Sequence, residues 1–231
     1  MTAMLKPSVP DFAAARRNMV EGQLRPNRVS DPRILVAMSE IPRELFVPFT
    51  HVGVAYLDEN IPLISDRSLM QPMILARLLQ AAEIAPDDRI LELAPGTGYS
   101  TLVLATLASS VFSIEPDALL YQEVEKNVEA YASGKAKVLA GAPVEGCIAH
   151  APFDVIFVNG SVEFVPEVLF EQLAEGGRLV AVMRSHGAAH AAHTGQARLY
   201  RKTKGDIAWV SLFDAHVPPA PGFDNPRGFT F

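Results

Sequence analysis

The chain has 231 residues, of which 49% are hydrophobic and 20% charged, and this is the composition of an ordinary globular protein. It excludes intrinsic disorder, collagen-like repeats and a coiled-coil rod. The net charge is -6, and the 20 Lys and Arg never run longer than a pair, so the sequence has no basic stripe of the kind that nucleic-acid-binding proteins carry.

The start of the chain and its apolar stretches argue against secretion and membrane insertion. Residues 1–20 hold Pro7 and Asp11 and no apolar core of a signal peptide. The longest apolar stretch, around Thr101–Ala108, is far shorter than the roughly 20 residues of a membrane-spanning helix. The single cysteine, Cys147, has no internal disulfide partner, which fits a reducing compartment. We expect a soluble, cytoplasmic protein that binds neither nucleic acid nor a membrane.

The N-terminal quarter predicts short helices that are broken by proline. Ser30-Asp31-Pro32 is typical of a helix start, because a capping residue precedes a proline in the first turn. Apolar residues then recur at helical spacing until Pro42 ends the helix. We assign residues 1–60 to an N-terminal helical cap, 61–217 to the main domain and 218–231 to a tail that packs on it.

Strands and helices alternate from residue 72 onward. Helices are expected over Met73–Ala82, Ser100–Ala108, Ala118–Tyr131 and Pro166–Leu173. Strands are expected over residues 89–94, 110–115, 137–140, 153–158 and 178–183. The third helix is expected to expose Glu123 and Asn127. Alternation of this kind predicts an α/β fold with a mostly parallel sheet and helices on both faces, and residues 197–217 predict an antiparallel hairpin at one edge.

A glycine turn after the first of these strands carries the candidate site. A parallel sheet binds ligands beyond the carboxyl ends of its strands, and glycine lets a backbone approach a ligand closely. Glu92 precedes the turn and Glu115 ends the next strand, where an acid can accept both ribose hydroxyls of a nucleoside. The turn Ala94–Gly98 lacks the full G-x-G-x-x-G spacing, which disfavours a dinucleotide and favours S-adenosylmethionine. The alternative is a plain strand–helix turn of some other α/β protein.

A series of further segments surrounds this turn in a characteristic order. They are Met19–Pro26 (MVEGQLRP), Asp31–Met38, Ile41–Pro48 (IPRELFVP), Ala55–Asp58, Pro62-Leu63, Gln71–Met73, Ile90–Tyr99, Val111–Glu115, Ala151–Val158 (APFDVIFV) and Gln172–Val182 (QLAEGGRLVAV). In their order and spacing the chain resembles the protein-L-isoaspartate O-methyltransferase family over nearly its whole length. The resemblance implies a class I methyltransferase fold with a Rossmann-like sheet and an N-terminal helical cap. It also implies S-adenosyl-L-methionine as the cofactor and the α-carboxylate of an isoaspartyl residue in damaged proteins as the acceptor.

Position by position, the resemblance assigns the cofactor-binding residues. Glu115 would hold the ribose. The others are Glu92, Ala94, Gly96 and Gly98 along the methionine part, Pro116 beside the adenine, and Ala142 and Pro143 in the following turn. The family has at the position of Ala142 an Asp that accepts from the adenine amino group. Since a neutral hydrogen bond contributes roughly 0.5–1.5 kcal/mol, its loss is expected to weaken cofactor binding about tenfold.

A second departure from the family lies in the acceptor loop, where Met70, Ser68 and Gln71 are the candidate residues. Aligned on Gln71-Pro72, the family's loop serine falls on Met70, which cannot donate a hydrogen bond. An acceptor carboxylate is ionised at neutral pH and needs no general base, and positioning supplies most of the rate. Met70 therefore predicts altered positioning or specificity rather than inactivity, and Arg67 and Ser68 are candidate partners for the acceptor carboxylate.

Two alternatives stay open beside isoaspartate repair. One keeps the fold and the cofactor but changes the acceptor to another carboxylate or a small molecule. The other is a non-catalytic protein that binds the nucleoside or a partner. An oligomeric state does not follow from the sequence, and a monomer is compatible with it.

Three other features carry less weight. His186, His190 and His193 could share one face of a helix and bind zinc, but no carboxylate or cysteine joins them, so we expect no metal site. Cys147 is expected to be a passive thiol. Asn159–Ser161 matches a glycosylation sequon, but we expect no glycan without a secretion signal.

Overall fold

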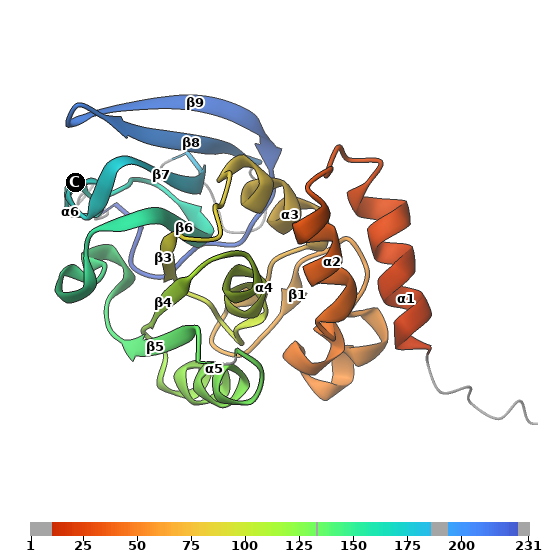
Figure 1. The fold of residues 1–231 in the computed structure, drawn as a ribbon. Helices are drawn as coiled ribbons and strands as arrows, with labels where there is room; N and C mark the ends of the chain where they lie inside the picture. The colour runs from red at the N-terminus through yellow and green to blue at the C-terminus, as the bar shows by residue number, and fades with distance from the viewer. Residues whose placement is uncertain (1–10, 133, 186–193, 226–231) are drawn as a thin grey trace, which may run out of the picture.

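A seven-stranded sheet forms the centre of the computed structural model, which describes residues 11–132, 134–185 and 194–225 (Figure 1). Its strand order is β5-β4-β3-β6-β7-β8-β9. The neighbours from β5 to β7 pair in parallel, and β8 and β9 add an antiparallel hairpin at one edge. The strands are β3 Arg89–Leu93, β4 Ser110–Glu115, β5 Ala136–Ala140, β6 Phe153–Val162, β7 Leu173–Met183, β8 Gly195–Thr203 and β9 Asp206–Ala215. The predicted α/β class and the edge hairpin are confirmed.

Helices cover the sheet on both sides, and the N-terminal ones stand together beside α4 at one end of the molecule (Figure 1). The α-helices are α1 Phe12–Met19, α2 Pro32–Glu40, α3 Pro72–Ala81, α4 Tyr99–Leu107, α5 Ala118–Tyr131 and α6 Glu167–Glu171. A short π-helix, η1, spans Val20–Leu24, and the short 3-10 helices are η2 Arg43–Phe46, η3 Phe49–Val54, η4 Pro143–Glu145 and η5 Ile148–His150. In the part of the chain with described structure, no helix is long and apolar enough to cross a membrane.

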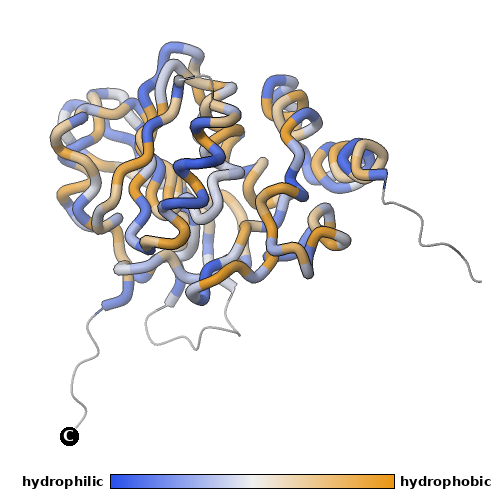
Figure 2. The backbone as a smooth tube through the Cα atoms, turned by 90° about the horizontal axis from the view of Figure 1, so that it is seen from below, coloured by the Kyte–Doolittle hydropathy of each residue, from blue (hydrophilic) through white to orange (hydrophobic). Residues whose placement is uncertain are grey.

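Two hydrophobic clusters pack on the two faces of the sheet. Successive strand residues point to opposite faces, so Ile90 joins the cluster under α3, α4 and the N-terminal helices while Leu91 joins the other one. The second cluster contains Leu169 from α6 and Phe223 from the C-terminal tail. Figure 2 shows hydrophobic stretches running through the interior of the sheet, while the N-terminal helices alternate between hydrophobic and hydrophilic residues. Burial on both faces explains why these strands read as nearly continuous apolar runs.

The predicted helix over Pro166–Leu173 is too long, and the strand after it begins earlier than expected. α6 ends at Glu171, and β7 already pairs at Leu173 with Phe153. A register shift follows, and Gly176 takes a φ of +77°, which glycine adopts without a steric cost. Leu173 is thus a strand residue whose side chain is buried in the second cluster.

The C-terminal tail lies beside the end of β6. Ser161 at the end of β6 exchanges backbone hydrogen bonds with Pro218 (2.9 Å) and Ala220 (2.8 Å). A Cβ at Gly160 would lie 2.8 Å from Ala220, so the close approach requires a glycine there. Phe223 is fully buried in the second cluster. Residues 226–231 of the predicted tail lie outside the described residues.

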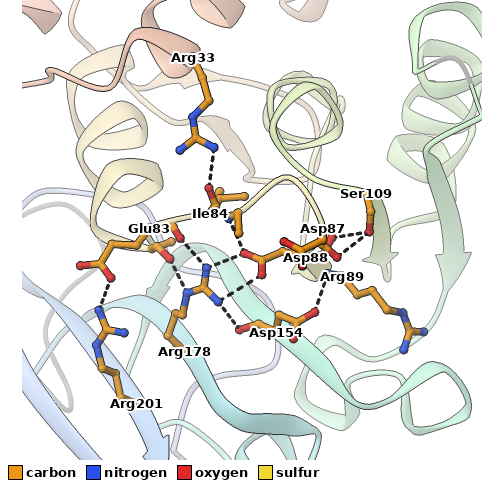
Figure 3. Close-up of polar contacts among 12 residues, drawn as sticks. Arg33, Glu83, Ile84, Asp87, Asp88, Arg89, Ser109, Asp154, Arg178 and Arg201 are labelled. Carbon is orange, nitrogen blue, oxygen red and sulfur yellow. Dashed lines mark hydrogen bonds and ion pairs between the residues drawn. The ribbon is translucent and has the colours of Figure 1, made fainter.

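A buried polar network ties the amino ends of the strands together, on the side away from the glycine turn (Figure 3). Arg178 of β7 forms an ion pair of 2.5 Å with Asp88 and donates to the carbonyl oxygen of Glu83 over 2.6 Å. Asp154 of β6 accepts a hydrogen bond of 2.8 Å from the backbone of Arg89. Because these charges are mutually satisfied, they fix the register of β3, β6 and β7 and leave the carboxyl ends for ligands.

Candidate functional site

The strand order reverses at β3, so the carboxyl end of that strand is a topological switch point of the sheet. β4 pairs with β3 on one side, and β6, which follows later in the chain, pairs on the other. Open α/β sheets bind ligands at such a switch point. The turn Ala94–Gly98 lies there, between β3 and α4, as the sequence predicts.

The turn holds three residues in the left-handed region. Ala94 has a φ of +63°, Gly96 of +65° and Gly98 of +91°. A Cβ on Gly98 would lie 2.7 Å from Val124 Cγ2, so glycine at this position lets α5 pack directly against the turn. Ala94 carries its Cβ in the same region, which costs on the order of 1 kcal/mol and is kept because the surrounding structure fixes the backbone.

Asn127 is not on the exposed face of α5, and this prediction is wrong. The residue is buried, and its Nδ2 donates a hydrogen bond of 2.8 Å to the carbonyl oxygen of Thr97 in the turn. The Thr97 hydroxyl in turn donates to the carbonyl oxygen of Phe46 over 2.8 Å. The turn is therefore held from α5 on one side and from the N-terminal region on the other.

Glu92 lies beneath the turn and is fully buried. Its carboxylate accepts hydrogen bonds from the hydroxyls of Ser100, Thr101 (2.5 Å) and Ser113 (2.8 Å). Burial raises the pKa of Glu92, and the three hydroxyl donors oppose that shift. The carboxylate thus fastens the first turn of α4 to β3 and β4, and its oxygens are occupied by side chains of the protein.

Asn159 joins this network from β6, and sequence reasoning missed it. Its Nδ2 donates a hydrogen bond of 2.7 Å to the Ser100 hydroxyl, which itself donates to Glu92. The sequence presents Asn159 as part of a glycosylation sequon. Its place near the end of a strand that flanks the switch point is the signal that could have identified it.

Glu115 ends β4 and is buried beside the turn. One carboxylate oxygen accepts from the backbone of Gly96 over 3.0 Å, and the other accepts from the backbone of Asp117 over 3.2 Å. The Arg67 guanidinium pairs with Glu115 at 2.8 Å and also donates to the carbonyl oxygen of Ala94 over 2.6 Å. Arg67, predicted as a partner of the acceptor carboxylate, is therefore engaged with the candidate ribose-binding acid.

The remaining predicted cofactor residues lie at the ends of β4 and β5. Pro116 follows Glu115 and is exposed. The backbone of Gly141 donates to the carbonyl oxygen of Glu115 over 3.4 Å, which brings the following turn alongside β4. In that turn Ala142 is half-buried and Pro143 is buried. The structure thus brings Glu115, Pro116 and Ala142 to one edge of the sheet.

The acceptor-loop residues have three different environments. Met70 is buried in the hydrophobic core, and its carbonyl oxygen accepts a hydrogen bond of 2.7 Å from Arg43. The backbone of Gln71 donates to Asn60 Oδ1 over 3.1 Å. Ser68 lies in β2 (Ser68–Leu69), which pairs with β1 (Ile61–Pro62), and it lines a cavity of about 630 Å³ together with Arg67 and Pro218–Pro221.

The acceptor groups at the switch point suit the predicted cofactor. The Glu115 carboxylate and the Ala94 carbonyl oxygen are both bound by N–H groups of one guanidinium, so both face a common space. The hydroxyls of a ribose and the ammonium group of a methionine also donate hydrogen bonds, as the guanidinium N–H groups do. The residues present therefore fit the ribose and the amino group of S-adenosylmethionine.

A mostly parallel sheet, a glycine turn at its switch point and an acid at the end of the next strand define a class I methyltransferase. The model of the family described as protein-L-isoaspartate(D-aspartate) O-methyltransferase matches residues 15–216. The chain belongs to this family, which confirms the predicted resemblance, and it is an S-adenosylmethionine-dependent methyltransferase.

Individual relatives agree with the family assignment. The protein-L-isoaspartate O-methyltransferase of Koribacter versatilis is 39% identical over 208 residues, which cover 89% of this chain and 94% of the relative. That of a Synechococcus strain is 38% identical over 76% of this chain and 74% of its own length.

Solved structures show the same fold. One named protein-L-isoaspartate O-methyltransferase superposes with a TM-score of 0.76 at 26% identity, over 91% of this chain and 67% of its own. The Plasmodium falciparum protein described as a putative protein-L-isoaspartate O-methyltransferase, in complex with S-adenosyl-L-homocysteine, has a TM-score of 0.74 at 19% identity. That match covers 89% of this chain and 97% of its own.

Two further features from the sequence analysis are the three histidines of the segment 186–193 and Cys147. His186, His190 and His193 lie outside the described residues. Within the residues whose structure is described, no group of three or more His, Cys, Asp or Glu could hold a metal ion. Burial raises the pKa of the partly buried Cys147 thiol, which favours the unreactive protonated form.

Proposed function

We propose that this methyltransferase esterifies the α-carboxylate of isoaspartyl residues in damaged proteins and peptides. The observation that carries the proposal is the pair of acceptors at the switch point, Glu115 and the Ala94 carbonyl oxygen, in a chain of this family. The names of its relatives specify the same acceptor. The net charge of -6 without basic runs and the absence of a membrane-spanning helix among the described residues support a cytoplasmic enzyme that acts on protein.

The cofactor is held by residues with distinct roles. Glu115 accepts from the ribose hydroxyls, and the Ala94 carbonyl oxygen accepts from the amino group of the methionine part. Gly96 and Gly98 shape the turn, while Pro116, Ala142 and Pro143 border the adenine. Glu92 is a positioning residue that fixes the turn through the hydroxyls of α4. Bound S-adenosylmethionine supplies a methyl group on a positively charged sulfur.

The acceptor requires placement more than activation. A carboxyl group with an ordinary pKa near about 4 is ionised at neutral pH, so no residue has to remove a proton from it. The protein has to hold the carboxylate in line with the methyl group and exclude water. Ser68, on the wall of the 630 Å³ cavity, is a donor for that carboxylate, and the buried Met70 sets the position of the loop.

A methyl-transfer assay with matched peptides tests the proposal. An isoaspartyl peptide and its aspartyl twin are offered with S-adenosylmethionine, and base-labile methyl ester is measured. We expect ester on the isoaspartyl peptide alone.

Glu115→Gln should raise the dissociation constant for S-adenosylhomocysteine at least tenfold, because a hydrogen bond to a charged group contributes about 1.5–3 kcal/mol. Glu123→Gln, an exposed carboxylate on α5, makes the same change of charge and should have no effect.

A second candidate function keeps the cofactor and changes the acceptor to another carboxylate. Met70 favours it, because a buried methionine stands at the position aligned with the family's loop serine. Binding of S-adenosylhomocysteine without esterification of either peptide would support this candidate. Neither binding nor transfer would instead indicate a non-catalytic relative.

A further inference from the structure

The loop between β1 and β2 inserts an arginine into the cofactor site. It is closed by backbone hydrogen bonds from Leu63 to the carbonyl oxygen of Arg67 (2.8 Å) and from Arg67 to that of Ile64 (3.1 Å). Ser65 and Asp66 at its tip have φ values of +55° and +54°, which non-glycine residues adopt at a cost. The tip is exposed, whereas Arg67 is buried. The strained turn is therefore stabilised by what Arg67 contacts inside the protein.

Arg67 contacts the two groups that the cofactor needs. Its Nη1 lies 2.8 Å from Glu115 Oε1, and its Nη2 lies 2.6 Å from the Ala94 carbonyl oxygen. Only 8% of the Arg67 side chain and none of the Glu115 side chain is exposed. The Leu63 side chain also covers the turn, since its Cδ1 lies 3.3 Å from where a Cβ of Gly96 would stand. While the guanidinium bridges these two acceptors, it competes for them with the ribose hydroxyls and the amino group of the cofactor.

When the Arg67 side chain moves away from Glu115, its positive charge needs a new partner. Next to it lies the cavity of about 630 Å³, which Arg67 and Ser68 line and which faces the tail at Pro218–Pro221. A side chain that is already on the cavity wall reaches the space by rotation about its own bonds. The methyl acceptor carries a carboxylate. A guanidinium can donate two parallel hydrogen bonds to such a group.

We propose that Arg67 is a positioning residue that passes from Glu115 to the acceptor carboxylate when the cofactor binds. In the ligand-free protein it closes the cofactor site, and in the loaded protein it orients the acceptor. The acceptor therefore binds tightly only to the enzyme that already holds the cofactor. This inference rests on the proposed carboxylate acceptor, while its first half concerns the cofactor alone.

Calorimetry with S-adenosylhomocysteine tests the first half without any acceptor. Arg67→Gln should lower the dissociation constant about tenfold, because the ligand no longer has to break a charge-assisted hydrogen bond. Arg67→Lys, which keeps the charge but cannot bridge both acceptors, should have a smaller effect in the same direction. Arg17→Gln removes an exposed arginine on α1 and should change nothing. Thermal melting of each variant confirms that it is folded.

Repeating the titration with saturating isoaspartyl peptide tests the second half. The peptide should tighten S-adenosylhomocysteine binding to the wild type and to Arg17→Gln, and this coupling should vanish in Arg67→Gln. Weaker or unchanged S-adenosylhomocysteine binding by folded Arg67→Gln, or coupling that persists in it, would overturn the inference. Tighter binding by Arg67→Gln, together with no esterification of the peptide by the wild-type enzyme and S-adenosylmethionine, would support displacement of Arg67 and reject the isoaspartyl acceptor.

Discussion

Arg43 donates a hydrogen bond of 2.7 Å from Nη2 to the carbonyl oxygen of Met70 and thereby joins the N-terminal region to the acceptor loop. Its Nε donates to the carbonyl oxygen of Ala55 over 2.8 Å, and its guanidinium carbon lies 4.9 Å from the centre of the Tyr99 ring. The side chain is fully buried, and burial lowers the pKa of Arg43 to about 10. One cation thus connects η2, η3, the loop before α3 and the first residue of α4.

Arg43→Met should destabilise the protein and loosen the acceptor loop. Two buried carbonyl oxygens lose their donor, and each unsatisfied group costs about 1–3 kcal/mol, so urea unfolding should show a loss of about 2–6 kcal/mol. The KM for an isoaspartyl peptide should rise more than the dissociation constant for S-adenosylhomocysteine, because the contact holds the loop and not the cofactor. Arg17→Met is the exposed control. Unchanged stability of Arg43→Met would contradict the role.

Glu92 makes the stability depend on pH in a direction opposite to that of most carboxylates. Since burial raises its pKa in the folded protein, the folded state keeps a proton that the unfolded chain, with an ordinary value of 4.5, has already lost. Stability from this group is present below that ordinary value and falls as the pH rises above it. Glu92→Gln should remove the effect. Unfolding free energies at pH 5 and pH 8 should show the wild type losing more than Glu92→Gln, and equal changes in the two proteins would show that the group does not titrate in this range.

Elements whose signals are local could be predicted closely from the sequence. β4 and α5 have the bounds that periodicity indicates, because alternation marks the strand and Asp117 caps the helix by accepting from Leu119 and Leu120. The glycine turn was likewise placed correctly at the switch point. In each case neighbouring residues carry the whole signal.

Contacts between distant residues could not be predicted in this way. Asn127 looks like a surface residue because it is polar, although it follows the buried Val124 by three residues on the same face of α5. The amide is satisfied there by Thr97, 30 positions earlier, a partner that periodicity does not show. Arg67 and Glu115 are 48 positions apart, so their ion pair depends on how a loop folds back over the sheet. The position of this guanidinium beside Glu115 could therefore not be predicted from the sequence.

Ala142→Asp should strengthen cofactor binding. Ala142 has an extended backbone with φ -84° and ψ 119°, which an aspartate adopts readily, and it lies in the turn beside Glu115. A carboxylate there regains the acceptor for the adenine amino group that the family resemblance implies, so calorimetry should give an S-adenosylhomocysteine dissociation constant about tenfold lower. Ala149→Asp adds the same charge at an exposed position and should have no effect. Equal affinities of Ala142→Asp and the wild type would mean that another oxygen already accepts from this amino group.

Met70→Ser tests whether the acceptor loop lacks a hydroxyl. Because Met70 is only 2% exposed and belongs to the core, its truncation should cost about 2–5 kcal/mol of stability whatever replaces it. Met70→Ala is therefore the matched control, since it leaves a similar cavity without a hydroxyl. If isoaspartate is the acceptor, kcat of Met70→Ser on the isoaspartyl peptide should exceed that of Met70→Ala about tenfold, as one oriented hydrogen bond provides.

Ser68 is the alternative hydroxyl donor to the acceptor carboxylate. It lines the cavity beside Arg67, whereas the Met70 side chain is enclosed by apolar neighbours. If Met70→Ser and Met70→Ala have the same kcat, the hydroxyl at position 70 is not what the loop lacks. Ser68→Ala, which removes a half-buried hydroxyl at little cost to the fold, should then lower kcat on the isoaspartyl peptide about tenfold, and this would identify Ser68 as the donor to the acceptor carboxylate.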